Sequence, residues 1–439
     1  MLTGATIFAP ATAPGRAGIA VIRISGPRAG AAMAALTGGG DLPPPRQATL
    51  SPLTDPETAE VIDHGLVLWF PGPHSFTGED VGEVHCHGGG AVTTALLGIL
   101  VGRQDCRLAE AGEFTRRAFQ NGKMDLTQAE GLADLIAAET EAQRRQAQRQ
   151  MAGALGQLYE GWRADLISAL AHLEADIDFP DEDFPDGVSL GQRPILGRLA
   201  AEISDHLEDG HRGERLRDGC HMVILGAPNV GKSSLLNALA RRDAAIVSSQ
   251  AGTTRDVVEV HLDLGGYPVV LADTAGLRDS EDAIEQEGVR RARARGDQAD
   301  LKIVLYDCTG NQTPDADVVA LLDGGILVAN KADLCTGTPA RGLAISTKTG
   351  QGMDHLLEHL TKAAQGLMAG SGAPGLTRMR HRQGLEACRD ALYRALEQGE
   401  GELLAEDVRL SARHLGRITG RVDVEDILDV VFGDFCIGK

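Results

Sequence analysis

The sequence is poor in aromatic residues, which make up 3% of its 439 residues, so aliphatic side chains must fill its cores. Its seven cysteines are scattered without CxxC spacing, which is typical of reduced thiols and excludes a disulfide scaffold. It lacks an apolar run long enough to cross a membrane, and its N-terminus lacks a basic segment followed by an apolar one. These absences predict a soluble, cytoplasmic protein with no membrane partner.

Positive charge is also scarce, since 42 Lys and Arg face 62 Asp and Glu and leave a net charge of −20. An acidic chain repels nucleic-acid phosphates at long range, so binding to RNA requires a local basic surface or a partner. The run QRRQAQRQ at 143–150 is one such surface if it lies on a helix. A solvated helix face that touches no RNA is the simpler interpretation of that run.

What the chain does have is length and apolar residues, at 439 residues and 43% hydrophobic, enough for about two to four domains. Residues 1–120 mix short apolar runs with Gly and Pro. Segments 19–25 and 64–70 are predicted strands, 91–102 is a predicted helix, and 38–56 a predicted surface loop. We therefore expect an N-terminal α/β domain.

Helical periodicity flanks an alternating segment. Apolar residues recur every three or four positions over 123–180, a further helix is expected over 189–217, and helical character returns from about 376. Residues 221–372 alternate apolar strands with helices, which predicts a mostly parallel sheet with helices on both faces. The predicted architecture is an α/β and α multidomain protein with these parts: an α/β domain at 1–120, a discontinuous helical domain at 121–216 and 375–439, and an inserted domain at 217–374.

The strongest motif is GAPNVGKS at 226–233, which follows an apolar strand and opens a predicted helix. Gly226 and Gly231 let the backbone wrap the phosphates of a nucleotide, and Lys232 brings a positive charge to them. The Ser233 hydroxyl is placed to bind Mg²⁺, and the helix N-terminus adds its dipole. The segment is therefore predicted to be a phosphate-binding P-loop.

A second motif, DTAG at 273–276, ends another predicted strand. Its aspartate can hold the metal through water, and Gly276 can offer a backbone N–H to the γ-phosphate. The loop 248–256 lies between the P-loop and DTAG, and its Thr253 and Thr254 hydroxyls are candidates for the metal and the γ-phosphate. An ordinary hydroxyl-stabilised turn is the alternative for that loop.

A third motif, NKAD at 330–333, distinguishes the base. A carboxylate at Asp333 accepts from the two donors of guanine, which adenine does not offer, and a buried unpaired carboxylate makes the wrong base costly. STK at 346–348 follows the last predicted strand, where a backbone N–H can read the guanine carbonyl. In this order the motifs predict an inserted P-loop GTPase domain with a Ras-like fold and GTP as its substrate.

The water-orienting group is not obvious. Many GTPases carry a glutamine directly after the DxxG glycine, but Leu277 stands there, and no arginine finger can be assigned. The acidic segment 278–288 offers carboxylates that include Glu285, although a solvated helix start is also typical of such a segment. A monovalent cation near the phosphates, with Asn229 as an oxygen ligand, can replace the charge of an arginine.

With these residues in place, the chain resembles the tRNA-modification GTPase family called MnmE or TrmE over nearly its whole length. The resemblance rests on ATAPGRAGIAVIRISG at 11–26, GEFTRRAFQNGKMDLTQAE at 112–130, the segment 229–256, and the terminal FCIGK at 435–439. A general GTPase shares only part of the third stretch, so the other three carry the resemblance.

The resemblance implies an N-terminal domain that binds a one-carbon tetrahydrofolate derivative and mediates homodimerisation. It also implies K⁺-stimulated, Mg²⁺-dependent GTP hydrolysis and a heterotetrameric complex with the flavoprotein MnmG, with FAD on that partner only. Together such proteins add an aminomethyl or carboxymethylaminomethyl group to carbon 5 of the wobble uridine of certain tRNAs.

Site residues follow from the motifs and the resemblance. Glu285 matches the catalytic glutamate of the family, and Ser233 and Thr254 are the expected Mg²⁺ ligands. The expected K⁺ ligands are Asn229, Ser248, Gln250 and Thr253, and the expected folate contacts are Arg23, Glu83, Lys123 and Lys439. The expected GTP-binding residues are Asn229, Val230, Gly231, Lys232, Ser233, Ser234, Ser248, Ser249, Gln250, Ala251, Gly252, Thr253, Thr254, Asp273, Thr274, Ala275, Gly276, Asn330, Lys331, Ala332, Asp333, Ser346, Thr347 and Lys348.

Two further groups of residues stay open. Cys436 in FCIGK is a candidate for the modification chemistry by the resemblance, although an isolated cysteine is more often inert. His85 and His87 flank Cys86 on a predicted strand, but two ligands do not make a zinc site, so no zinc is assigned.

The nucleotide motifs do not separate a tRNA-modifying enzyme from a regulatory GTPase switch that binds RNA or the ribosome without folate chemistry. Segment 1–130 and the FCIGK terminus favour the enzyme. A structural dimer scaffold with an inactive nucleotide site is a third interpretation, and it predicts no hydrolysis of GTP.

Overall fold

The computed structural model divides the chain into two compact units, Met1–Ala133 with Gly416–Lys439, and Asp134–Leu415. The residues described are 4–178, 188–242, 244–246, 259–273, 299–309, 313–335, 337, 339–370, 374–397, 401–422, 424–433 and 435–438. Among them, none of the helices has the length and apolar character needed to span a membrane.

The first unit is built on a six-stranded sheet in the order β3-β4-β5-β2-β1-β6. Its strands are β1 (Thr6–Pro10), β2 (Ala17–Ser25), β3 (Thr49–Thr54), β4 (Val61–Phe70), β5 (Val81–Gly88) and β6 (Cys106–Leu108). Neighbouring strands are antiparallel except β1 and β6, which are parallel. Alternate apolar residues such as Ile22 and Ile24 are fully buried under α1 (Ala29–Leu36) and α2 (Gly90–Val101), as period-two patterning requires.

The C-terminal segment completes the first unit. Helix α15 (Glu425–Gly433) packs on α3 (Glu113–Gln120), with Phe432 next to Phe119. Gly112 precedes α3 at φ +66°, and a Cβ there would overlap the carbonyl oxygen of Phe432. Glycine is therefore required at this close approach. Beyond the helix, Ile437 forms a β-bridge with Ala111.

The second unit contains a six-stranded sheet in the order β12-β11-β10-β7-β9-β8. Its strands are β7 (Cys220–Gly226), β8 (Glu259–Leu264), β9 (Tyr267–Asp273), β10 (Leu301–Asp307), β11 (Ile326–Asn330) and β12 (Leu343–Ala344). All pairs are parallel except the edge hairpin β8–β9. The mostly parallel sheet predicted from the alternating runs is confirmed.

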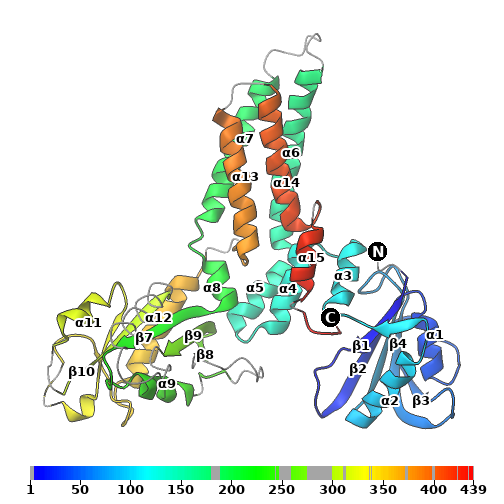
Figure 1. Cartoon of the computed structure of the whole chain (residues 1–439), viewed down its shortest axis with the longest axis horizontal. Helices are drawn as coiled ribbons and strands as arrows, with labels where there is room; N and C mark the ends of the chain where they lie inside the picture. The colour runs from blue at the N-terminus through cyan, green and yellow to red at the C-terminus, as the bar shows by residue number, and fades with distance from the viewer. Residues whose placement is uncertain are drawn as a thin grey trace, which may run out of the picture. The chain divides into compact units, whose positions relative to one another are not determined.

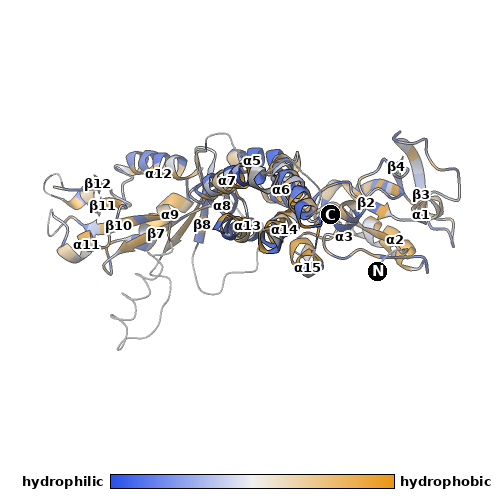
Figure 2. Cartoon of the chain, turned by 90° about the horizontal axis from the view of Figure 1, so that it is seen from above, coloured by the Kyte–Doolittle hydropathy of each residue, from blue (hydrophilic) through white to orange (hydrophobic). Residues whose placement is uncertain are grey.

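Apolar residues on both faces of this sheet explain its runs of Val, Ile and Leu, because a parallel sheet is covered on each side. One core packs against α9 (Lys232–Ala240) and α12 (Met353–Met368), and the other against α11 (Ala316–Ala320). Figure 2 shows that the visible side of α12 carries hydrophilic residues, as expected for the outer face of a covering helix.

The remaining helices of the second unit form a bundle and a connection to the sheet. Helices α6, α7, α13 and α14 run side by side, as Figure 1 shows, and Arg409 bonds α14 to Glu174 of α6 at 2.7 Å. Helices α5 and α8 lie where the bundle meets the sheet. The bounds are α4 (Leu126–Ala137), α5 (Glu141–Met151), α6 (Ala154–Asp178), α7 (Val188–Leu207), α8 (Arg212–Asp218), α13 (Met379–Glu397) and α14 (Glu402–Thr419).

Three local expectations need correction. The stretch 38–56 is not wholly a loop, because it contains β3, an edge strand where the missing N–H of Pro52 is tolerated. The helical stretch 123–180 is three helices, and a capping box at Thr140 with Gln143 starts the second. The stretch 189–217 is two helices, separated where Gly210 takes φ +67°. The division at 120, 216 and 374 stays a prediction.

Phe432→Ala should lower the stability of the first unit by about 3–5 kcal/mol, because its ring is 2% exposed and packs on α3. Val430→Ala is the matched control in the same helix, where the side chain is 69% exposed and the change should stay under about 0.5 kcal/mol. Amide hydrogen exchange of β1 and β2 reports this stability in the full chain. Equal protection in the two variants would contradict the packing role of Phe432.

Candidate nucleotide-binding site

The P-loop connects β7 to α9 and depends on two glycines. Gly226 has φ +149° and Gly231 has φ +102°, conformations that side chains disfavour. A Cβ at Gly226 would overlap the carbonyl oxygen of Leu305, and one at Gly231 would overlap the side-chain amide of Asn330. The loop therefore closes tightly on its neighbours.

Lys232 is the first residue of α9, and its side chain folds back over the loop. Its ammonium donates to the carbonyl oxygens of Gly226 and Ala227 at 2.9 and 3.0 Å, and the residue is 9% exposed. Gly231 is the N-cap, so the N-terminus of α9, whose first turn includes Ser233, lies beside that charge. A lysine, a helix N-terminus and a cradle that a Cβ would fill fit the phosphates of a nucleotide.

Asn330 connects three loops at this edge of the sheet, namely the P-loop, the NKAD loop that it starts, and the STK loop. Its side-chain amide donates to the carbonyl oxygen of Val230 in the P-loop at 2.8 Å, and its Oδ1 accepts from the backbone N–H of Thr347 at 3.3 Å. The residue ends β11 and is 1% exposed. One buried side chain therefore fixes the P-loop relative to the two expected base-recognition segments, 330–333 and 346–348.

Lys331 is held by a residue that the motifs did not single out. Its Nζ lies 2.6 Å from Oδ2 of Asp307, at the end of β10. Burial alone would raise the pKa of Asp307, but hydrogen bonds from Lys331 and Thr309 outweigh it and lower the pKa below its usual value. The sequence signal was available, since Asp307 ends the apolar run LKIVLYD at the same edge as Asn330.

The base-recognition segments lie side by side. The N–H of Ala332 donates to the carbonyl of Ile345 at 2.9 Å, and that of Ile345 donates to Ala329 at 2.8 Å. Asp333 stands in a short 3-10 turn and is exposed, so its carboxylate is available to a ligand. Ser346 is fully buried, whereas Lys348 is exposed.

Some expected site residues fall outside the described part of the chain. They are Ser248, Ser249, Gln250, Ala251, Gly252, Thr253, Thr254, Thr274, Ala275, Gly276, Glu285 and Lys439. Asp273 is described as the last residue of β9, in register with Ile224 of β7, which places its backbone at the same edge as the P-loop.

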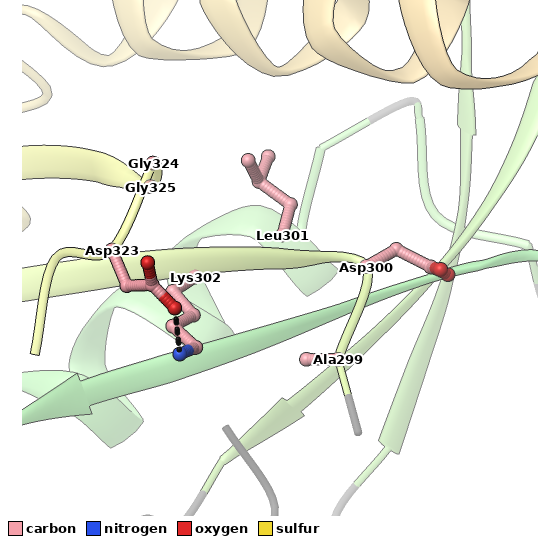
Figure 3. A pocket seen from close by; sticks show the side chains of 7 residues that line it. All are labelled: Ala299, Asp300, Leu301, Lys302, Asp323, Gly324 and Gly325. Atoms are coloured by element: carbon pink, nitrogen blue, oxygen red, sulfur yellow. Dashed lines mark hydrogen bonds and ion pairs between the residues drawn. The ribbon is translucent and has the colours of Figure 1, made fainter. Parts of the chain in front are cut away.

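A separate hollow of about 200 Å³ lies at the amino-terminal edge of this sheet, away from the P-loop. Figure 3 shows its lining, in which Lys302 reaches Asp323 at 3.2 Å. Asp300 in the same lining bonds Arg215 at 2.6 Å. Each of these charged groups already has a partner, so the hollow adds nothing to the nucleotide site.

The first unit brings together two of the expected folate contacts. Arg23 on β2 pairs in register with Glu83 on β5, and their side chains bond at 2.9 Å from Nε to Oε1. The guanidinium lies over the rings of Phe76 and Phe114, at 5.3 and 5.8 Å from their centroids. A half-buried charged pair beside aromatic rings is suited to an anionic ligand with a planar ring.

The other two candidates in this unit are less enclosed. Lys123 is exposed, and its Nζ donates to the carbonyl oxygen of Pro73 at 2.6 Å, in the loop that also carries Phe76. Cys436 is an exposed free thiol. Its neighbour Gly438 lies against Pro10, the β1 residue next to the register partner of Arg23.

Comparisons with known proteins cover the whole chain. The family model of the MnmE helical domain matches residues 126–436, and that of the GTP-binding protein TrmE N-terminus matches residues 6–123. A tRNA modification GTPase MnmE of Rhodospirillum rubrum is 56% identical over 459 residues, with 100% of each chain covered. One of Parvibaculum lavamentivorans is 57% identical over 438 residues, covering 99% of this chain and 100% of that one.

Among solved structures, the G domain of the T. maritima FeoB iron transporter is 26% identical and covers 33% of this chain and 98% of its own, with a TM-score of 0.25.

Asn330→Ala should raise the Kd for GDP by about tenfold to a hundredfold, because it leaves Val230 and Thr347 without their buried partner. Thr349→Ala is the matched control in the neighbouring loop, where the side chain is exposed, and should change the Kd less than about twofold. Titration of a fluorescent GDP analogue measures both. An unchanged Kd for Asn330→Ala would show that the amide does not hold the loops.

Proposed function

The chain belongs to the MnmE family of tRNA modification GTPases, and from that premise we propose that it hydrolyses GTP in order to modify tRNA. The proposed product is an aminomethyl or carboxymethylaminomethyl group on carbon 5 of the wobble uridine, made together with the flavoprotein MnmG in a heterotetrameric complex. FAD is assigned to that partner only, and the complex is placed in the cytoplasm with this chain as a homodimer.

The observation that carries the nucleotide assignment is the double hydrogen bond of Asn330. Because it ties the P-loop to Thr347, the phosphate cradle and the exposed carboxylate of Asp333 lie at one edge of one sheet. A guanine bound there offers its two donors to Asp333, whereas adenine leaves the carboxylate unpaired. GTP is therefore the proposed substrate rather than ATP.

Hydrolysis requires a positioned water and compensation of the charge that develops on the phosphates. Glu285 is the proposed group that orients the water. Ser233 and Thr254 would hold Mg²⁺, and Asn229 with Ser248, Gln250 and Thr253 would hold K⁺. Asn229 takes φ +63° in the P-loop, a conformation that asparagine tolerates better than most residues. Bound cations would supply the positive charge that an arginine finger gives elsewhere.

The proposed one-carbon donor is a tetrahydrofolate derivative bound by the first unit. Arg23, Lys123 and Lys439 suit the glutamyl carboxylates, and Glu83 suits the donor edge of the pterin. The pairing of Arg23 with Glu83 beside Phe76 and Phe114 supports this assignment. Cys436 lies in the same unit and is the proposed residue for the modification chemistry.

Nucleoside analysis of tRNA tests the whole proposal. A strain that lacks this protein should lose the modified wobble uridine, and the wild-type chain should restore it. Lys232→Ala should fail because the phosphates lose their cation, and Arg23→Ala should fail because the folate loses its anchor. Restoration by Arg23→Ala but not by Lys232→Ala would instead favour a regulatory GTPase switch without folate chemistry.

Rates of GTP hydrolysis test the catalytic groups. Sodium in place of potassium should slow hydrolysis at least about tenfold, and Glu285→Ala should slow it about a hundredfold while nucleotide affinity stays unchanged. Glu287→Ala is the matched control in the same acidic segment and should keep the wild-type rate. Equal rates in both salts would contradict the proposed role of K⁺. Equal rates for Glu285→Ala and Glu287→Ala would contradict the proposed role of Glu285.

A further inference from the structure

A second pocket of about 390 Å³ lies inside the second unit, where the helices meet the nucleotide-binding sheet. It is formed by α5, by the start of α8, by the β8–β9 turn and by the segment after α12. Figure 1 shows these elements next to one another, and α5 contacts both α8 and β9. No part of this pocket belongs to the P-loop or to the base-recognition segments.

The lining of this pocket is basic in a chain of net charge −20. It contains Arg145, Arg149 and Arg212, against a single carboxylate, Glu141. Glu141 is already bonded to Arg145, with Oε1 2.7 Å from Nε. Within the described residues, neither Arg149 nor Arg212 has an ion-pair or hydrogen-bond partner. Both side chains are exposed, so the pocket presents two guanidinium groups that have no carboxylate partner, and this favours a negatively charged occupant.

A buried hydroxyl in the pocket also favours a ligand, one that accepts a hydrogen bond. Thr377 lines the pocket and is 2% exposed, yet its Oγ1 has no hydrogen-bond partner among the described residues. An unpaired buried hydroxyl is unfavourable, because it has lost water without gaining a partner. A ligand that enters the pocket and accepts from this hydroxyl would remove that cost.

The size and the remaining lining exclude a bare anion as the best occupant. Tyr267, Leu216 and Met368 add apolar surface to the lining of the pocket. About 390 Å³ is far more than one phosphate group fills. A phosphate attached to a ribose and a base suits both the arginines and the apolar residues of the lining, because guanidinium groups bind phosphate and an aromatic ring stacks on a base.

We propose that this pocket binds a phosphate-bearing nucleotide of an RNA chain. The inference rests on the proposed function, which makes tRNA the RNA in question. In this proposal Arg149 of α5 and Arg212 of α8 contact the backbone phosphate, while Thr377 donates its hydroxyl.

The pocket also has a direct connection to the nucleotide site. Its wall includes Gly265 and Gly266, the turn of the β8–β9 hairpin, and the carbonyl of Gly266 accepts from the N–H of Ala142 in α5 at 3.0 Å. The same hairpin starts directly after the segment 247–258 and ends at Asp273. RNA bound at the turn therefore contacts the hairpin whose two ends lead into the loop 248–256 and the DTAG motif at 273–276, so RNA and GTP affinities are coupled.

Anisotropy of fluorescein-labelled total tRNA with the full chain tests the pocket. Arg149→Gln and Arg212→Gln should each weaken binding about threefold to tenfold and lower the salt slope by about 1. Arg144→Gln removes the same charge from the same helix outside the pocket and should change affinity less than twofold. An equal loss of tRNA affinity for Arg144→Gln and Arg149→Gln would contradict binding in the pocket and would favour non-specific electrostatic attraction.

Two further measurements separate occupation from structure. Thr377→Val removes the unpaired hydroxyl, so it should keep or raise the thermal midpoint yet weaken tRNA binding; unweakened binding would overturn the contact. Inorganic phosphate and GMP test whether the pocket is a small-anion site instead. That would follow if either compound binds tightly to the wild-type chain alone and abolishes its tRNA binding at millimolar concentration.

The coupling between tRNA binding and GTP binding is tested by measuring GTP affinity with and without tRNA. Saturating tRNA should change the affinity of the wild-type chain for GTP, and this effect should shrink in the Arg149→Gln, Arg212→Gln double variant. An identical GTP affinity with and without bound tRNA would overturn the connection through the hairpin. Nucleoside analysis distinguishes the two proposals. If the wild-type chain restores the modified uridine but the pocket variants bind tRNA normally, only the pocket proposal is refuted and the proposed function stands.

Discussion

The nucleotide site depends on one buried side chain. Asn330 donates to the P-loop through Val230 and accepts from Thr347, so loops separated by about a hundred residues share one fixed point. Its position also explains Gly231, because the amide lies where a Cβ would be. An asparagine suits this place because its side chain offers a donor and an acceptor in one plane. Base and phosphate recognition are therefore parts of one hydrogen-bonded unit.

Much of this arrangement could be predicted from the sequence, because its causes are local. The strands ending at Gly226, Asp273 and Asn330 are short apolar runs, and each is followed by a motif. In a parallel sheet the carboxyl ends of such strands share one edge. Order along the chain therefore predicted that the motifs meet, before any contact was known. The family followed from stretches that a general GTPase lacks.

What the sequence did not predict depends on contacts between distant segments. Strand β3 contains Pro52 and looks like a loop until its edge position is known. Asp307 is one of many carboxylates until Lys331 is found beside it. The arginines of α5 looked like an ordinary solvated helix face, and only the placement of α8 and the β8–β9 turn turns that face into the wall of a pocket. Periodicity within one helix contains no information about such neighbours.

The division into two units constrains how the parts can act together. Arg23 and Cys436 belong to the first unit, whereas the P-loop and the basic pocket belong to the second. The backbone passes between the units within α4 and α14. Helix α5, which carries Arg145 and Arg149 of the pocket, begins just after α4 and starts at its own capping box. RNA bound against α5 would therefore act on the β8–β9 hairpin, because the N–H of Ala142 in α5 donates to the carbonyl of Gly266 in its turn.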